Sequence, residues 1–249
     1  RGGPSSGTVV YSQQEVNLTT YGGNGEGHRI VYSTASHQDI YDYVIKAFNV
    51  AWKYRFPTFV LGDGYQAKMR EPMVMYDPAA RGIEMVPAQR LVGLPGEIGV
   101  DRESVHLCNI YSLEEELYDV LQKIEADYQK IIPEVIEYEQ KYCDDAEIII
   151  ISHGVVSRAA WDAVKMLRAQ GVRAGYFRPI TLRPFPQEAL KKAAASAQKI
   201  LVVESAVNQL QRLVRENLYG LALGIESLAK PGVGIDADEI VVRYQEIQG

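Results

Sequence analysis

The chain has 249 residues, 47% of them hydrophobic and 23% charged, and its net charge is −6. That length allows one or two domains with a sizeable buried core. The acidic balance argues against a nucleic-acid-binding surface, and no apolar run approaches the ~20 residues of a membrane span. We therefore expect neither a nucleic-acid partner nor a membrane, and we place the protein in the cytoplasm.

Cysteine usage predicts no metal or cluster site. Cys108 and Cys143 are too few and too far apart for a disulfide framework or a CxxC motif. We expect both to be structural thiols in a reducing compartment, and the chain has no iron–sulfur ligand set of its own.

The chain begins with RGGPSSG at residues 1–7, a loop sequence that carries one guanidinium. A cloning remnant, a tail and a functional loop are all compatible with it. Residues 29–35 (RIVYSTA) predict a strand, Ser36 the N-cap of a long helix, and Pro57 its end, before a second strand in TFVLGDG. Strand, helix and strand with short connections indicate parallel pairing. One helix face is expected to be buried, formed by Ile40, Val44, Ala47, Phe48 and Ala51.

The middle of the chain, residues 77–112, is rich in proline and glycine and predicts a connector that lies over a surface. A long amphipathic helix is expected after it, over residues 112–142. Ser112 and Glu115 match a capping box, and Pro133 should kink or restart the helix.

Residues from Ala146 onward predict a second α/β unit. Its first strand, AEIIIISHG, is apolar without alternation, which favours a strand covered on both faces. The expected order is strand–helix three times and then a final strand in EIVVRY at residues 239–244. This is an α/β fold with a parallel-type sheet and helices on its faces.

Three features are candidate sites. The glycines of YGGNGEG, residues 21–27, lack the G-x-G-x-x-G spacing and precede a strand, so they predict a flexible or ligand-ordered loop. Asp63 follows a parallel strand, where ligands bind in such sheets, but the sequence favours a turn aspartate that bonds local backbone. His153 ends the first strand of the second unit and is either a site residue or a core histidine. The four histidines share no metal-ligand spacing, so no metal site is expected.

The order of motifs resembles the α subunit of the 2-oxoacid:ferredoxin oxidoreductases. The matching stretches are RGGPS, the strand ending in DGY, the PFP of RPITLRPFP and the VVE of VVESAVNQLQRLVRE. The resemblance covers nearly the whole chain. It implies a partial thiamine-diphosphate pyrimidine-type domain followed by a transketolase C-terminal-like domain. The expected bounds are residues 1–76 for the first, 77–145 for the connector and long helix, and 146–249 for the second, with the amino-terminal part of the pyrimidine domain lacking.

The resemblance also implies a function. It is the oxidative decarboxylation of a 2-oxoacid with coenzyme A in anaerobic metabolism (EC 1.2.7 type), with electrons passing to ferredoxin. Thiamine diphosphate and Mg²⁺ would be held mainly by a partner subunit, and iron–sulfur clusters by partners among the β, γ and δ subunits.

Three residues would contact the substrate according to this resemblance: Arg1, Ser5 and Val10. Arg1 matches the arginine near the substrate carboxylate, and a guanidinium grips a carboxylate through paired hydrogen bonds. Ser5 allows close backbone approach. Val10 stands where 2-oxoglutarate enzymes often have threonine, which favours a branched-chain substrate. The Gly-Gln of the family is Asn208–Gln209 here. The alternative function is a non-catalytic assembly module with a transketolase C-terminal-like fold.

Overall fold

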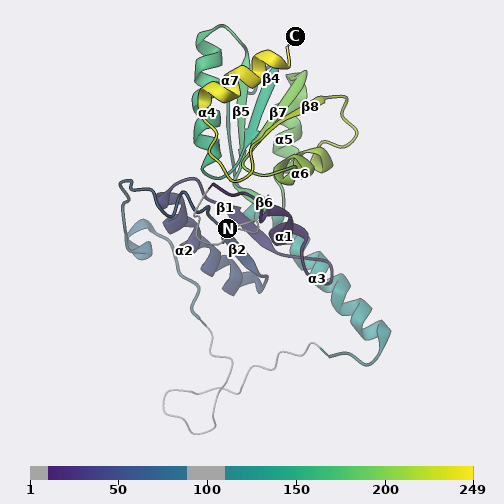
Figure 1. Cartoon of the computed structure of the whole chain (residues 1–249). Helices are drawn as coiled ribbons and strands as arrows, with labels where there is room; N and C mark the ends of the chain where they lie inside the picture. The colour runs from purple at the N-terminus through teal and green to yellow at the C-terminus, as the bar shows by residue number, and fades with distance from the viewer. Residues whose placement is uncertain (1–10, 89–109, 249) are drawn as a thin grey trace.

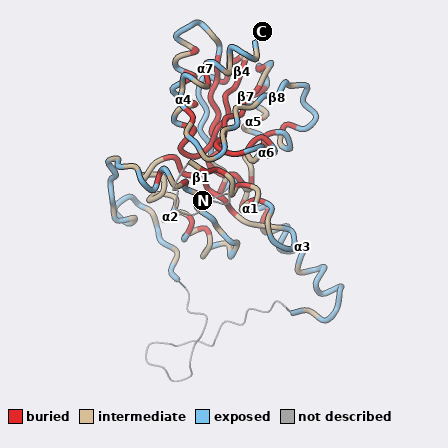
Figure 2. Tube along the Cα trace, in the orientation of Figure 1, coloured by how far each residue is buried: buried red, intermediate tan, exposed pale blue. Residues whose placement is uncertain are grey.

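The computed structural model describes residues 11–88 and 110–248. Two sheets form the cores of two α/β units, one above the other in Figure 1. Buried residues concentrate within the larger sheet and where the two units meet (Figure 2). The α/β fold class predicted from the sequence is confirmed.

The smaller sheet has the strand order β2–β1–β6. Its strands are β1 (Ile30–Ser33), β2 (Thr58–Leu61) and β6 (Thr181–Arg183). β1 and β2 are parallel, as the strand–helix–strand pattern predicted, whereas β6 comes from the later part of the chain and pairs antiparallel with β1. The two units are therefore joined through a shared sheet edge. The domain bounds inferred from the sequence stay a prediction.

Helix α2 (His37–Tyr54) connects β1 to β2 and begins as predicted, because the Ser36 hydroxyl accepts the backbone N–H of Asp39. The predicted buried face is wrong. Val44 and Phe48 are exposed, and of the five predicted positions only Ala47 is buried. The helix packs instead through a neighbouring stripe that contains Tyr43, Val50 and Tyr54. Apolar side chains occupy more than one side of this helix, so periodicity alone selected the wrong side.

Residues 74–86 lie along α2, which agrees with the connector prediction for its first residues; residues 89–109 of the predicted connector lie outside the described residues. The side chains of Gln38, Tyr41 and Asn49 hydrogen-bond to backbone groups of this segment. It includes the short 3₁₀ helix η1 (Pro78–Arg81). A small helix, α1 (Val16–Tyr21), precedes the glycine loop.

The long helix of the middle region is α3 (Glu114–Val135), and it differs from the prediction at both ends. Its N-cap is Leu113 and no side chain caps it, so the Ser112–Glu115 capping box does not form. Pro133 lies in the last turn without restarting the helix. The residues after it form an antiparallel edge strand, β3 (Tyr138–Lys141), which pairs with β5. The competing strand partner explains why helix periodicity failed there.

The larger sheet has the order β3–β5–β4–β7–β8, with all strands but β3 parallel. Its strands after β3 are β4 (Ile148–Ser152), β5 (Ala174–Pro179), β7 (Lys199–Glu204) and β8 (Gly224–Ala229). β4 is buried along its whole length, which confirms the prediction from its unbroken apolar run.

Helices cover both faces of this sheet (Figure 1). They are α4 (Val156–Ala169), α5 (Gln187–Ala193) with the 3₁₀ turn η2 (Ala194–Ser196), α6 (Gln209–Asn217) and α7 (Ala237–Glu246). The predicted final strand at residues 239–244 is wrong, because this segment lies in α7, which begins with a capping box between Asp236 and Glu239. The last strand is β8, whose sequence GIESLA is too polar to stand out.

Candidate active site

The carboxyl ends of β1, β2 and β4 meet at a cavity of about 50 Å³ between the two units. Its polar lining includes Gln13, Ser33, Thr34, Asp63 and His153. Ligands of open parallel α/β sheets bind outside the carboxyl ends of the strands. This volume holds a few water molecules or one small polar group. The cavity is therefore too small to enclose a whole cofactor and would line only part of a binding site.

Ser33 and His153 connect the two sheets across this cavity. The Ser33 hydroxyl lies 2.8 Å from His153 Nδ1, and both side chains are buried. Burial lowers the pKa of His153 to about 3, because it disfavours the imidazolium, and the nearby Arg178 charge acts in the same direction. His153 is therefore neutral near pH 7.

The other ring nitrogen of His153 is unpartnered among the residues that the structure describes. Nε2 is buried and makes no hydrogen bond there. A neutral imidazole has one donor and one acceptor nitrogen, and Ser33 engages only Nδ1. Since a buried polar atom without a partner is costly, Nε2 is available to a group bound in the cavity.

Asp63 presents a second unpartnered atom. Its Oδ1 accepts the backbone N–H of Gln66 at 2.8 Å, as expected for a turn aspartate, whereas Oδ2 is buried without a partner within the described ranges. Burial raises the pKa of Asp63, although hydrogen bonds from local backbone N–H groups oppose that shift. The two roles considered from the sequence thus belong to different oxygens. Oδ1 stabilises the turn, and Oδ2 is available to a ligand.

Gln13 holds the amino-terminal segment against the larger sheet. Its side chain donates to the carbonyl of His153 at 2.6 Å and accepts the backbone N–H of Ser205 at 2.7 Å. Its backbone N–H also donates to the Ser205 carbonyl. These contacts lie at the carboxyl ends of β4 and β7, where the order of strands in the sheet changes direction. Gln13 therefore occupies the position where a ligand of an isolated sheet would bind.

Gly154 allows Gln13 to approach this closely. Gly154 has φ of +58°, and a Cβ atom there would lie 2.9 Å from Gln13 Nε2. Any side chain at this position would meet both backbone strain and a steric clash. The turn between β4 and α4 is thus shaped for the amino-terminal segment.

Only some of the residues that the sequence singled out line the cavity. Asp63 and His153 both line the cavity. The glycine loop of residues 21–27 is not part of the lining; its Gly27 carbonyl instead accepts from Arg29 and Arg183. Arg1, Ser5 and Val10 lie outside the described residues, so their roles stay predictions.

Sequence reasoning missed Gln13 and Ser33. Neither belongs to a chemical motif, and their partners are 140 and 120 residues away in the chain. The signal that was available is the small-polar end of β1, Ser33–Thr34, which stands at the edge where ligands bind.

No helix among the described residues is long and apolar enough to cross a membrane.

In residues 11–88 and 110–248 no group of three or more His, Cys, Asp or Glu side chains is arranged to hold a metal ion. The cavity lining within these ranges includes two acidic side chains, Glu15 and Asp63, and no lysine or arginine.

Two family models match the chain in sequence order. Residues 1–140 match the thiamine diphosphate-binding domain of pyruvate flavodoxin/ferredoxin oxidoreductases, and residues 146–234 match core domain II of pyruvate:ferredoxin oxidoreductase. The chain belongs to the 2-oxoacid:ferredoxin oxidoreductase family. The resemblance inferred from RGGPS, DGY, PFP and VVE is thereby confirmed.

Curated relatives of this 2-oxoacid:ferredoxin oxidoreductase chain carry two different substrate names. It is 32% identical to the 2-oxoglutarate synthase subunit KorA of Methanothermobacter marburgensis, over 97% of this chain and 70% of the relative. It is 29% identical to the ketoisovalerate oxidoreductase subunit VorB of the same organism, over 100% of this chain and 69% of the relative. Sequence identity therefore does not separate the two substrate types.

Solved structures show the same fold. The 2-oxoglutarate:ferredoxin oxidoreductase of Magnetococcus marinus aligns with a TM-score of 0.79 and 21% identity, over 99% of this chain and 47% of that one. A split-gene transketolase aligns with a TM-score of 0.52 and 14% identity, over 94% of this chain and 61% of that one. Both alignments confirm the expected fold, which this chain shares with a transketolase over most of its length.

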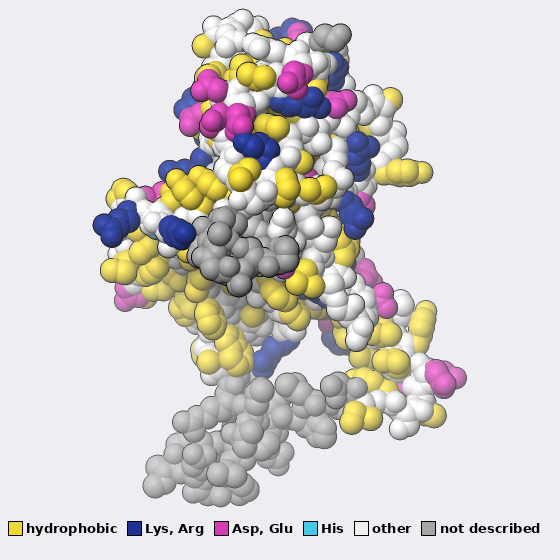
Figure 3. All heavy atoms as spheres, in the orientation of Figure 1, with side chains coloured by type: hydrophobic (Ala, Val, Ile, Leu, Met, Phe, Trp, Pro, Cys, Tyr) yellow, Lys and Arg dark blue, Asp and Glu magenta, His cyan; other side chains and the backbone are white. Residues whose placement is uncertain are grey.

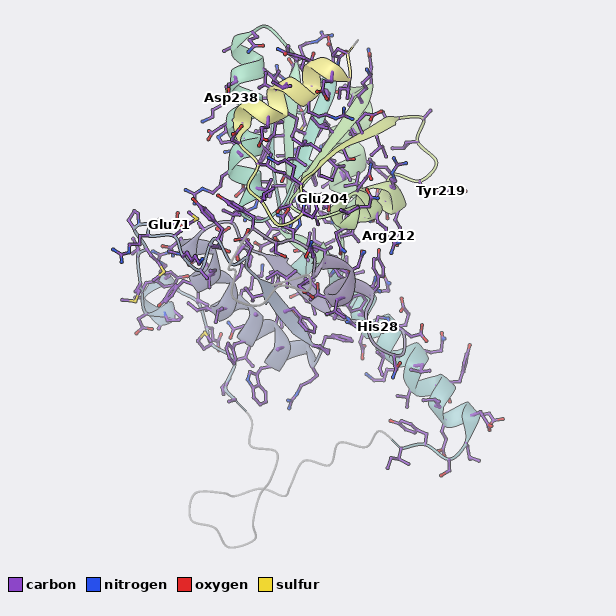
Figure 4. The ribbon with its side chains drawn as sticks, viewed as in Figure 1. His28, Glu71, Glu204, Arg212, Tyr219 and Asp238 are labelled. Carbon is purple, nitrogen blue, oxygen red and sulfur yellow. The ribbon has the colours of Figure 1, made fainter. Side chains whose placement is uncertain are left out.

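Two family motifs have clear structural roles. The glutamate of VVE is Glu204, which is buried at the junction of the two units (Figure 4). Its carboxylate accepts the backbone N–H groups of Gln209, Leu210 and Gln211 at the start of α6. Asn208 takes the place of the glycine of Gly-Gln with φ of 57°, a conformation that asparagine tolerates better than most residues.

Proposed function

We propose that this chain is the α subunit of a cytoplasmic, thiamine diphosphate-dependent 2-oxoacid:ferredoxin oxidoreductase. With coenzyme A it converts a 2-oxoacid to the acyl-CoA and CO₂, and electrons pass through iron–sulfur clusters on partner subunits to ferredoxin. The observation that carries this proposal is the cavity at the carboxyl ends of β1, β2 and β4, within the two matched family domains.

The unpartnered polar atoms in this cavity fit a wall of the thiamine site. Asp63 Oδ2 offers a hydrogen-bond acceptor, and His153 Nε2 offers a neutral ring nitrogen. When bound, thiamine diphosphate would supply the nucleophilic carbon for addition to the keto group of the substrate. This chain's part is to orient polar groups at the wall and to exclude water from it. Mg²⁺ and the diphosphate are assigned mainly to a β-type subunit.

The substrate carboxylate needs a cation that the described cavity lining lacks. Two acidic side chains and no basic ones line the cavity within the described ranges. Arg1 supplies the guanidinium in this proposal, and Ser5 allows the loop backbone to approach the substrate. Removal of one partner of a desolvated charge pair costs about 2–5 kcal/mol. Arg1→Ala in the assembled enzyme should therefore lower kcat/KM with about that loss and raise KM.

A branched-chain 2-oxoacid is the favoured substrate in this proposal. The reason is Val10, an apolar side chain that cannot hydrogen-bond a second carboxylate. Val10→Thr should shift the ratio of kcat/KM values from 2-oxoisovalerate toward 2-oxoglutarate. A preference of the wild type for 2-oxoglutarate would keep the family activity and overturn the role of Val10.

The experiment is native mass spectrometry of the complex purified with its partner subunits, followed by viologen reduction with coenzyme A and a panel of 2-oxoacids. A heteromer that contains thiamine diphosphate and is most active on 2-oxoisovalerate supports the proposal. A homomer without thiamine and without turnover contradicts it and leaves the non-catalytic assembly module.

A further inference from the structure

The amino-terminal half of α3 projects from the body of the molecule (Figure 1) and is exposed along its length (Figure 2). Its apolar side chains include Leu117 and Leu121, which are 41% and 36% exposed, and Ile124, also 36% exposed. Figure 3 shows hydrophobic side chains gathered on this arm. A soluble chain rarely leaves a helix stripe of this kind uncovered.

The exposed side chains continue a stripe that is buried in the other half of the same helix. The stripe is formed by Leu117, Leu121, Ile124, Tyr128, Ile131 and Val135, with alternating spacings of four and three residues. Tyr128, Ile131 and Val135 pack in the core of the smaller unit. This spacing is the seam of a helix that packs against a second element along its whole length.

Charge identifies the kind of element that covers the exposed half. Residues 113–124 carry four acidic side chains, Glu114, Glu115, Glu116 and Asp119, and one basic side chain, Lys123, which pairs with Asp127. Two copies that paired through these halves would bring like charges together, which is destabilising. Residues 89–109 of the same chain contain two arginines and three acidic residues, so they do not supply a basic complement either.

We propose that the stripe Leu117–Leu121–Ile124 docks a basic, amphipathic segment of a different subunit. The partner segment would present apolar side chains to the seam and lysine or arginine beside the glutamates of the first turn. This rests on the proposed heteromeric enzyme but concerns a surface remote from the cavity. The apolar seam supplies the contact area, and the flanking charges select against a second copy of this chain.

The first test compares Leu121→Arg with Ala126→Arg in the full chain co-expressed with its partner subunits. Ala126 is exposed on the opposite side of α3, so it controls for the added charge. Both substituted residues are exposed. Leu121→Arg should weaken subunit association at least tenfold by native mass spectrometry, while Ala126→Arg stays within twofold of wild type. Equal association of both variants and wild type would overturn the proposal.

The second test identifies the occupant. Replacement of Glu114, Glu115 and Glu116 by glutamine should weaken heteromer association and flatten its dependence on salt. If a second copy of this chain occupied the stripe, the same variant would strengthen self-association, which contradicts the proposal. Hydrogen exchange of the isolated chain tests whether another part of the same chain covers the stripe. Strong protection of residues 117–124 without any partner would show that it does, which contradicts the proposal.

These outcomes are distinguishable from a failure of the proposed activity. Subunit association is measured without substrate, so an inactive but assembled complex still tests the docking surface. An active complex that includes Leu121→Arg with wild-type association would reject the surface and leave the enzyme function intact.

Discussion

His153 Nδ1 lies 2.8 Å from the Ser33 hydroxyl, and this contact joins the carboxyl end of β4 to that of β1. Both residues are almost fully buried. The two sheets therefore meet at a hydrogen bond between side chains that are far apart in sequence.

The pH dependence of stability should report the burial of His153. Its pKa falls from an ordinary 6.5 to about 3 in the folded chain. As the pH drops below about 6.5, the unfolded state gains a proton that the folded state does not, so stability is lost down to about pH 3. The slope approaches about 1.4 kcal/mol per pH unit. His153→Gln should remove this slope in denaturant unfolding between pH 6.5 and 5; an unchanged slope would show that His153 is not buried as neutral imidazole.

Gln13 should stabilise the folded chain through its side-chain hydrogen bonds. Gln13→Leu removes the bonds to the His153 carbonyl and the Ser205 amide, leaving a buried N–H group without its partner. The expected cost is about 1–3 kcal/mol in the free energy of unfolding. Gln14→Leu is the control at the next position. Equal unfolding free energies for the two variants would contradict the bridging role.

Gly154→Ala should disturb the hydrogen bond between the Gln13 side chain and the His153 carbonyl. The new Cβ would lie 2.9 Å from Gln13 Nε2, and the residue would have to keep φ of +58°. We expect a loss of about 1–3 kcal/mol from backbone strain, and more from the displaced glutamine. Gly171→Ala isolates the strain, since Gly171 also has positive φ but nothing within 4 Å of its Cβ position. Thermal unfolding of both variants checks this, and Gly154→Ala should be the less stable.

Glu204 should stabilise the start of α6. Its carboxylate accepts three backbone N–H groups at 2.9 to 3.2 Å. Burial raises the pKa of Glu204 and these hydrogen bonds oppose the shift. Glu204→Gln keeps the side-chain size but removes the charge and replaces one accepting oxygen by an NH₂ group, so we expect a loss of about 1.5–3 kcal/mol. A variant as stable as wild type in urea unfolding would show that the charge has no part in this cap.

The sequence predicted the elements whose apolar pattern has one interpretation. The uninterrupted run of β4 could only be a covered strand, and Ser36 before α2 was a clear helix start. The errors have physical causes. Strand β3 depends on its pairing with β5, and the segment at residues 239–244 has β-branched residues but lies in a helix because Asp236 and Glu239 cap it. Of the described residues that line the cavity, the sequence singled out only Asp63 and His153, because Ser33 and Gln13 acquire their roles from contacts across the fold. The roles of Arg1, Ser5 and Val10 stay predictions.

The most direct test of the central claim compares Asp63→Asn with Asp238→Asn in the assembled enzyme. Asp63 lines the cavity, whereas Asp238 is exposed on α7, away from it (Figure 4). Asparagine keeps an oxygen that accepts the backbone N–H of Gln66. It replaces the unpartnered oxygen by an NH₂ group and removes the negative charge. With saturating thiamine diphosphate and coenzyme A, Asp63→Asn should lower kcat/KM for the preferred 2-oxoacid at least tenfold, about 1.4 kcal/mol, while Asp238→Asn matches wild type. Wild-type kinetics for Asp63→Asn would contradict the assignment of this cavity to the active site.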